Sequence, residues 1–351
     1  MPIIDDENQL YDLELSKKFN SHFGNSADGR LIDNFGNYWY ISQENELSNF
    51  VSLLEENIGI PIGRFLHNSA ADSFELILEP VQKMKFGFFA GKKRRNLLKE
   101  YWGIYGWGYF DSNNDSITTN VYSSIVSGFY LSLIELDQGF RSKIQWRQVK
   151  DNLIICEFND LNKSLSLPQS LQDMPWVKSS KSLAEGSNHL LEKQEIGWSI
   201  DGKMSFVLPC DMINRIIFNA GGYIDNINKS VFDFWTLEGV DKRFSSSMIC
   251  ILQSCKELFT ASDVFVYLND SNNWKSLIES HLKPFGLGSI KHLSSTENTD
   301  IFEVGLESNA PLIMGKIAGI WERANGKKCR CSIELNKTNF KMSIESLLSY
   351  N

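Results

Sequence analysis

The chain has 351 residues, of which 42% are hydrophobic and 22% charged. This composition excludes a disordered tail, a collagen and a disulfide-stapled scaffold, because it supplies enough apolar side chains for packed cores. Lys and Arg number 35 against 43 Asp and Glu, so the formal net charge is −8. That balance argues against nucleic acid as a partner, since a general nucleic-acid binder needs a broad basic surface. At roughly 150 residues per domain, the length predicts about two domains.

The sequence of residues 1–24 predicts an N-terminal helical extension. This segment is acidic and lacks the basic and apolar regions of a secretory signal. No stretch of the sequence reaches the roughly 20 apolar residues that a transmembrane helix requires. The six cysteines do not form a disulfide framework in so long a chain. We therefore expect a cytoplasmic protein with reduced thiols, and we expect Cys329 and Cys331 to point to opposite faces of a strand.

Residues 25–160 predict a first domain in which helices and strands occur in blocks, as in α+β folds. Apolar spacing and glycine positions set the element boundaries. In chain order we expect a strand opened by Asp28-Gly29, a helix over Leu47–Ile58, a helix over 96–102, a strand opened by Gly106 and Gly108, a helix closed by Gly139, and strands over Arg141–Val149 and Leu153–Phe158.

Residues 195–351 predict a second domain that repeats the first. Sliding the sequence by 187 positions places Gly128 on Gly315, Glu135 on Glu322, and Gly139 on Gly326. The remaining landmarks follow with gaps: Asp201-Gly202, a helix over Met212–Ala220, the pair Gly286 and Gly288, and strands over Lys327–Leu335 and Phe340–Ile344. Residues 161–194 predict a linker that packs through Trp176. We expect an α+β fold of two mixed helix and antiparallel-sheet copies, arranged as an internal pseudo-dimer.

Three features of the sequence carry a family resemblance. They are the helix end Leu53-Leu54-Glu55-Glu56-Asn57-Ile58-Gly59-Ile60-Pro61-Ile62-Gly63-Arg64-Phe65-Leu66, the strand opening Gly106-Trp107-Gly108, and the helix with Gly128, Glu135 and Gly139 or their counterparts. These features resemble the four-vinyl-reductase-like domain, a relative of the ligand-binding fold of haem nitric-oxide sensors and TRAPP subunits. The resemblance implies dimer-like pairing and either a hydrophobic or aromatic ligand held between helices and sheet, or an assembly role.

The chain departs from the family at its cysteines. The family's Glu and spaced-cysteine ending survives only as Cys156-Glu157-Phe158, whereas the second copy has Lys341-Met342-Ser343. The five histidines lie far apart in sequence, and a zinc site needs three or four converging ligands, so we expect no metal. Glu135 and Glu322 lack a catalytic partner in the sequence, so we expect them to lie on a helix surface or to bond a neighbouring strand.

Aromatic residues are the best candidates for ligand binding. Six of the residues between 101 and 110 are aromatic, and aromatic walls suit a flat apolar ligand, although aromatics also fill ordinary cores. The candidate ligand-binding residues are Phe65, Trp102, Trp107, Phe129, Trp235 and Trp321.

A run of aromatic and basic residues is a second candidate site. Its members are Phe86, Phe88, Phe89, Lys92, Lys93, Arg94 and Arg95. The rings and cations would suit an anionic membrane surface or an acidic protein partner. The alternative is a buried loop followed by a solvated first helical turn, although cations there oppose the helix dipole.

Together these patterns predict a non-catalytic ligand-binding protein or assembly factor, cytoplasmic or peripheral to a membrane, with a protein partner in a larger complex. Its ligand would be apolar or tetrapyrrole-like, and the resemblance implies a role in assembling a pigment–protein (photosystem) complex. No motif specifies a cofactor. Two alternatives stay open: a reductase-like enzyme acting on a tetrapyrrole or another planar substrate, and a structural scaffold subunit.

Overall fold

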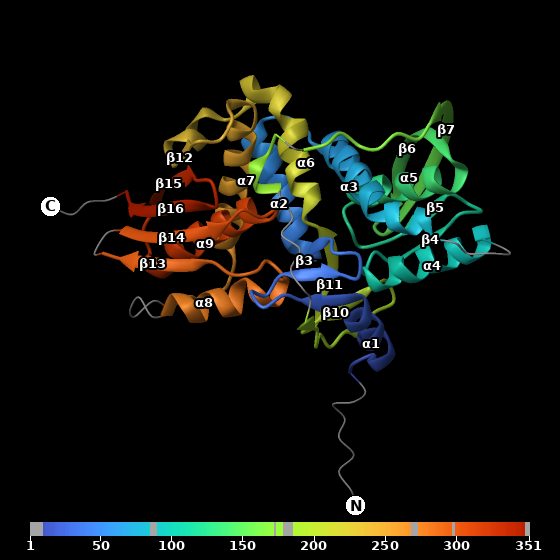
Figure 1. Ribbon diagram of the computed structural model, residues 1–351, viewed down its shortest axis with the longest axis horizontal. Coiled ribbons are helices and arrows are strands. Elements are labelled where there is room, and N and C mark those ends of the chain that lie inside the picture. Colours follow the sequence, from blue (N-terminus) through green and yellow to red (C-terminus); the bar gives the residue numbers. More distant parts are fainter. Residues whose placement is uncertain are drawn as a thin grey trace, which may run out of the picture.

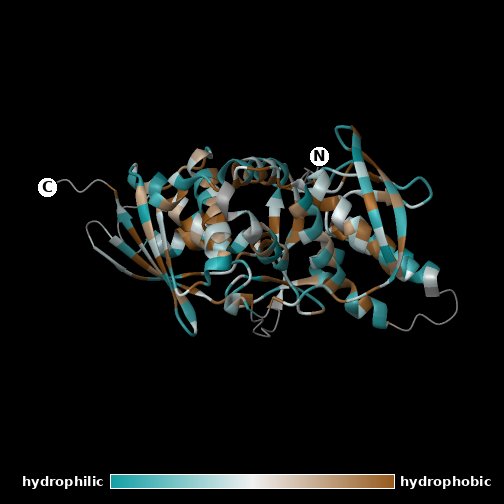
Figure 2. Ribbon diagram, turned by 90° about the horizontal axis from the view of Figure 1, so that it is seen from above, coloured by the Kyte–Doolittle hydropathy of each residue, from teal (hydrophilic) through white to brown (hydrophobic). Residues whose placement is uncertain are grey.

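The computed structural model describes residues 10–84, 90–171, 173–177, 185–267, 273–296 and 299–347. Two mostly antiparallel sheets lie at opposite ends of the molecule, with helices between them and a third sheet near the centre (Figure 1). Hydrophobic residues concentrate in the helices between the end sheets and alternate with hydrophilic ones along the end strands (Figure 2). The expected α+β fold with two similar halves is confirmed. Within the described ranges, no helix has the length and apolar character needed to cross a membrane.

The first copy runs from an N-terminal helix to a long hairpin. Its elements are α1 (Leu13–His22), β1 (Phe23–Asn25), β2 (Leu31–Asp33), β3 (Tyr38–Gln43), α2 (Glu44–Ile58), α3 (Gly63–Lys83), α4 (Ala90–Ile104), β4 (Tyr109–Asp111), β5 (Ser116–Thr118), α5 (Ser123–Gln138), β6 (Phe140–Lys150) and β7 (Leu153–Ser164). The following segment contains a 3-10 turn over Pro175–Val177, whose Trp176 is fully buried and donates from Nε1 to Asn214 Oδ1 at 2.9 Å.

The second copy repeats the order of hairpin, three helices, hairpin, helix and hairpin. Its elements are β8 (Glu185–Gly186), β9 (Glu192–Lys193), β10 (Trp198–Ile200), β11 (Lys203–Pro209), α6 (Asp211–Ala220), β12 (Trp235–Glu238), α7 (Lys242–Ala261), α8 (Asn273–His281), β13 (Lys291–Ser295), β14 (Thr299–Gly305), α9 (Ala310–Asn325), β15 (Cys329–Leu335) and β16 (Asn339–Ser346). One strand, β12, has no counterpart in the described part of the first copy.

The central seven-stranded sheet joins the two copies. Its order is β8-β1-β2-β3-β11-β10-β9, so β3 of one copy pairs with β11 of the other. Ile41 lies opposite Val207 in this antiparallel pair, and each residue comes five positions after the glycine of its hairpin turn, Gly36 or Gly202. The turn at Gly36 is therefore the counterpart of the turn at Gly202. The expected match of Asp28-Gly29 with Asp201-Gly202 is wrong, because Asp28-Gly29 lies in the preceding hairpin.

The copies also exchange elements. Helix α2 of the first copy packs on α7 of the second, and α6 of the second packs on α3 of the first. The contacts mirror each other: Asn57 Nδ2 donates to Ser254 Oγ at 3.0 Å, and Asn219 Nδ2 donates to Ser69 Oγ at 2.9 Å. We define the first lobe as α3–β7 with β10, β11 and α6, and the second lobe as α7–β16 with β2, β3 and α2.

The glycine-opened strands dock on the exchanged hairpins. Gly106 and Gly286 both have positive φ, at 78° and 70°. Close to Gly106, the backbone N–H of Val207 donates to the carbonyl of Tyr105 at 2.9 Å. Around Gly286, the carbonyl of that glycine accepts the N–H of Leu31 at 3.3 Å. A side chain at either glycine would press against a strand of the other copy. A Cβ on Gly106 would lie 2.9 Å from a backbone oxygen of β11, and a Cβ on Gly286 would lie 2.5 Å from Cβ of Leu31.

Helices α5 and α9 form the centres of the two lobes. An added Cβ on Gly128 would lie 2.3 Å from the carbonyl oxygen of His67, and one on Gly315 would lie 2.6 Å from that of Leu252. Only glycine permits this close approach, because contacts this short do not occur for a real Cβ. The two glycines thus let α5 pack tightly on α3 and α9 on α7.

The two equivalent glutamates tie these helices to the strands that follow them. Glu135 Oε1 accepts the backbone N–H of Ser142 at 2.7 Å, and its Oε2 pairs with Arg141 at 2.6 Å. Glu322 makes the same two contacts. It accepts the backbone N–H of Cys329 at 3.0 Å and pairs with Lys328 at 3.1 Å. Both side chains are buried. The expectation that they bond a neighbouring strand is confirmed.

Candidate functional site

Three of the six predicted ligand-binding residues meet in the core of the first lobe. Trp107 stacks on Phe129 with ring centroids 4.0 Å apart and an interplanar angle of 12°. Its Nε1 donates to the carbonyl of Val207 at 2.8 Å, and Trp102 Nε1 donates to the carbonyl of Trp107 at 3.1 Å. All three rings are at most 1% exposed. They therefore pack on one another and leave no room between them for a ligand.

The other three lie apart from this cluster. Phe65 is half-buried near the end of α6. Trp235 Nε1 donates to Gln253 Oε1 at 2.7 Å, and Trp321 Nε1 donates to Asp300 Oδ2 at 2.8 Å. Buried indole groups normally find such acceptors, so these contacts are typical of core positions. None of the six residues lines either of the two cavities described next.

The larger cavity lies in the second lobe and has a volume of about 710 Å³. This size is within the range of roughly 300–1,000 Å³ that small-molecule sites occupy. Its walls come from α2 and β3 of the first copy and from α7, α9 and the segment before β13 of the second. Apolar lining residues include Leu47, Phe50, Leu258, Phe259, Phe285 and Leu312. We call it the second-lobe cavity.

Comparison of the lobes explains why this cavity is open. Leu287 lies between Gly286 and Gly288, the position that Trp107 has in the first lobe. Lys316 directly follows Gly315 on α9, the position that Phe129 has on α5. Leu287 and Lys316 both line the second-lobe cavity. The stacked pair that fills the first lobe is thus replaced by a smaller apolar side chain and a flexible cation. Neither residue was among the predicted site residues, although the 187-residue offset aligns Phe129 with Lys316.

Lys316 places a cation inside this apolar wall. Its side chain is 14% exposed, and its Nζ lies 4.3 Å from the ring centroid of Phe285 and 5.9 Å from that of Phe259. Both rings attract a cation over their faces. An acidic group, Glu46, reaches it only at 3.9 Å. Burial, helped by Lys316, lowers the pKa of His281, which also lines the cavity.

All six cysteines are buried. Cys255 lines the second-lobe cavity, and burial raises its pKa to about 12. Cys329 and Cys331 are both fully buried, with Sγ atoms 3.8 Å apart. The expectation that they point to opposite faces is wrong, because residues two apart on a strand share a face. Within the described ranges, no group of three or more His, Cys, Asp and Glu side chains could hold a metal ion.

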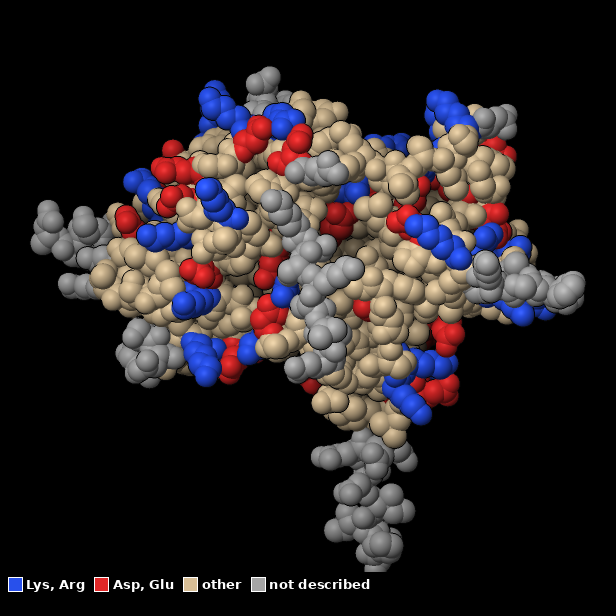
Figure 3. Space-filling model, in the orientation of Figure 1, with Lys and Arg blue, Asp and Glu red and all other residues tan. Residues whose placement is uncertain are grey.

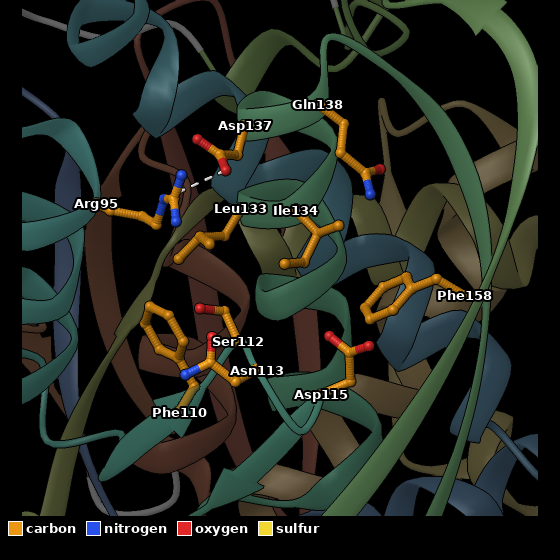
Figure 4. Close-up of a pocket in the computed structure, with 10 residues that line it drawn as sticks. All are labelled: Arg95, Phe110, Ser112, Asn113, Asp115, Leu133, Ile134, Asp137, Gln138 and Phe158. Carbon is orange, nitrogen blue, oxygen red and sulfur yellow. Dashed lines mark ion pairs between the residues drawn. The ribbon is translucent and has the colours of Figure 1, made fainter. Parts of the chain in front are cut away.

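A smaller cavity of about 290 Å³ lies in the first lobe, between α5 and the strands of its end sheet. Figure 4 shows Phe110 and Phe158 at its opposite sides, with Arg95 and Asp137 turned toward one another. Arg95 Nε lies 3.4 Å from Asp137 Oδ2. Polar groups thus line much of its wall, and its volume is at the lower end for a ligand site.

The predicted membrane-or-partner segment is only partly described. Its phenylalanines, Phe86, Phe88 and Phe89, lie outside the described residues. Of the four cations in this segment, Lys92, Lys93 and Arg95 are exposed, whereas Arg94 is half-buried. Arg94 and Arg95 both pair with Asp137, at 3.3 and 3.4 Å. On the face shown in Figure 3, basic side chains are interspersed with acidic ones.

Comparison with protein-family models, with characterised proteins and with solved structures finds no match to this chain. The resemblance to the four-vinyl-reductase-like domain therefore stays a prediction. The second-lobe cavity and the exposed cations at the start of α4 are the structural features that point to a function.

Proposed function

We propose that the protein binds an apolar small molecule in the second-lobe cavity and does not transform it. The observation that carries this proposal is the substitution between the lobes. Where the first lobe has the stacked Trp107 and Phe129, the second has Leu287 and Lys316, which border a volume of about 710 Å³. In this duplicated fold, aromatic rings fill the interior of the first lobe, whereas the equivalent interior of the second lobe is open. The first lobe therefore suits stability and the second suits binding.

The chemistry of the cavity favours binding over catalysis. Its thiol, Cys255, is protonated at neutral pH because burial raises its pKa to about 12. The imidazole of His281 is neutral, since burial lowers its pKa. General acid–base catalysis works best with groups whose pKa lies near the operating pH and that contact one another or the substrate. The reductase-like alternative would need a reductant bound in the same cavity.

The side chains that line the cavity suit a flat apolar ligand. Phe50, Phe259 and Phe285 contribute aromatic surface, and leucines from α2, α7 and α9 complete it. A tetrapyrrole-like molecule has the planar apolar body that such walls accept. The family resemblance points to the same ligand class, and through it to a part in assembling a pigment–protein complex.

A second candidate role, docking on an anionic surface, is supported by the exposed cations at the start of α4. Lys92, Lys93 and Arg95 lie within one helical turn of one another. In a protein of net charge −8, such a local excess of cations favours an acidic protein partner or an anionic membrane. This role is compatible with ligand binding and would place the cavity within a larger complex.

The binding proposal is tested by refilling the cavity. The neutral fluorophore 1-pyrenebutanol is titrated into the wild-type protein and into Leu287→Trp, which restores the aromatic side chain of the first lobe. The matched control is Leu167→Trp, the same change at a leucine that is 65% exposed. We expect saturable one-to-one binding to wild type and control, and its loss in Leu287→Trp with an unchanged circular dichroism spectrum. Absence of binding to wild type, or equal binding to folded Leu287→Trp, would overturn the proposal.

A further inference from the structure

We infer that the ligand of the second-lobe cavity carries an acidic group, and that Lys316 binds this group. The inference rests on the proposed function and adds the chemical class of the ligand: an amphipathic acid with an apolar, aromatic or chain-like body. The expectation from sequence named only an apolar or tetrapyrrole-like ligand and assigned no role to Lys316.

The Lys316 ammonium is incompletely paired. This group carries three N–H donors, yet among the described residues the nearest carboxylate oxygen is that of Glu46, at 3.9 Å, close to the outer limit for an ion pair. Its other close neighbours are the faces of Phe259 and Phe285, which accept no ordinary hydrogen bond. A largely buried cation is costly unless it is paired and hydrogen-bonded. A ligand anion at this position would supply both the charge and the acceptors.

The other charged residues around the cavity lie nearer to solvent than Lys316. Glu46 is 35% exposed and Lys316 only 14%, so the acid is nearer to solvent and the cation is deeper. Two further charged residues, Asp263 and Lys203, also line the cavity, and Lys203 is exposed. His281 contributes no charge at neutral pH because its pKa is lowered. The deep end of the cavity is therefore positive, which favours a negatively charged group there.

Lys316 extends from a tightly packed position of α9. It follows Gly315 on α9, where close packing against α7 fixes the helix, because an added Cβ on Gly315 would lie 2.6 Å from Leu252 O and from Cys255 Cβ. The base of the Lys316 side chain is thus held by a rigid helix–helix contact, while its flexible end reaches the aromatic rings. The alkyl stem of Lys316 can pack along the apolar wall while its ammonium group binds an acid. The site can therefore accept acids whose apolar parts differ in shape.

The experiment compares two probes that differ only in the acid: 1-pyrenebutyrate and 1-pyrenebutanol. Both are titrated by fluorescence into the full-length wild-type protein and into Lys316→Met, which keeps an apolar stem without the charge. We expect wild type to bind the acid more tightly than the alcohol. Lys316→Met should weaken acid binding by about tenfold or more, the usual effect of losing a hydrogen bond to a charged group, and leave alcohol binding within about twofold.

A second variant supplies an effect of opposite sign. In Glu46→Gln the competing carboxylate is removed, so the acid should bind a few-fold tighter than in wild type and the alcohol should bind equally well. If neither probe binds wild type, the proposed function itself fails. The inference is wrong if wild type binds the acid no more tightly than the alcohol, or if Lys316→Met changes the affinity of both probes equally. In either case the cavity would bind ligands without recognising an acidic group.

Discussion

Ile41 and Val207 face each other at the centre of the seven-stranded sheet, and they are equivalent positions of the two copies. A residue pairs with its own counterpart only where a twofold relation passes through the pair, so the pseudo-symmetry of the molecule is centred there. Because β3 and β11 each also dock against the other copy's glycine-opened segment, the interface between copies is part of both cores. The chain is thus a fused dimer with exchanged first hairpins and helices.

The exchange predicts that the two lobes unfold together. Each lobe lacks its first hairpin and helix unless the other copy supplies them, so neither core is complete by itself. We expect one transition in urea, with coincident curves from tryptophan fluorescence and far-ultraviolet circular dichroism. Two separated transitions would show that the lobes are stable independently, contrary to this account.

The close contact at Gly128 predicts a large cost for a single methyl group. Gly128→Ala would place Cβ 2.3 Å from the carbonyl oxygen of His67, and relieving this overlap requires α5 to move away from α3. We expect a loss of about 1–3 kcal/mol in the free energy of unfolding, measured by urea denaturation. The control is Gly103→Ala in helix α4, where an added Cβ meets nothing within 4 Å. That change should be neutral or stabilising by up to about 1 kcal/mol.

The buried carboxylate of Glu322 predicts both a mutational effect and a pH dependence. It lies 3.3 Å from Lys256, and both side chains are 2% exposed. Glu322→Gln would leave the Lys256 ammonium buried without its partner, so we expect a loss of about 3–5 kcal/mol. Lys328→Gln removes a partner that is 65% exposed and should cost less than about 1 kcal/mol. Similar losses in the two variants would contradict the assigned role.

The pH dependence follows from the direction of the Glu322 pKa. Burial raises the pKa of this carboxyl, but Lys256, the Cys329 N–H and Lys328 outweigh that effect, so the folded-state pKa lies below the ordinary value of 4.5. A depressed carboxyl pKa contributes stability that is present above the ordinary value and lost as the pH falls through the folded-state value. Wild type should therefore lose stability below pH 4.5 more steeply than Glu322→Gln. Equal slopes in urea denaturation at pH 3–5 would contradict this assignment.

The cations of α4 predict salt-sensitive attachment to anionic vesicles. Replacing Lys92, Lys93 and Arg95 with Ser should weaken binding to phosphatidylserine vesicles by about a hundredfold, at about 1 kcal/mol per cation. The melting temperature should hardly change, because exposed charges contribute little to folding. The control replaces Lys143, Lys150 and Lys163, which are exposed on the end sheet. Equal losses in the two triple variants would show a general charge effect and no specific surface.

Sequence patterns predicted the repeat well because glycines carry it. A helix that ends in a left-handed residue, as at Gly139 and Gly326, or that touches another helix, as at Gly128 and Gly315, needs glycine for local geometric reasons. Such landmarks are readable without a structure. The exchange of hairpins could not be predicted, because the apolar runs of β3 and β11 indicate that each forms a buried strand but not which copy that strand joins.

The same limit applies to the site. Aromatic density around Trp102 and Trp107 marks buried surface, and density alone does not separate a packed core from a ligand wall. The informative signal was a difference between copies: Lys316 where the first copy has Phe129 inside an otherwise apolar helix. That difference acquires meaning only once both positions are known to face the interior of their lobes.

The most direct test of the account is a crystal structure of the protein with 1-pyrenebutyrate. We predict the pyrene ring in the second-lobe cavity beside Phe259 and Phe285, its carboxylate within hydrogen-bond distance of Lys316 Nζ, and the stacked pair of Trp107 and Phe129 undisturbed in the first lobe. A ligand bound at any other place, or one whose carboxylate points away from Lys316, would contradict the account.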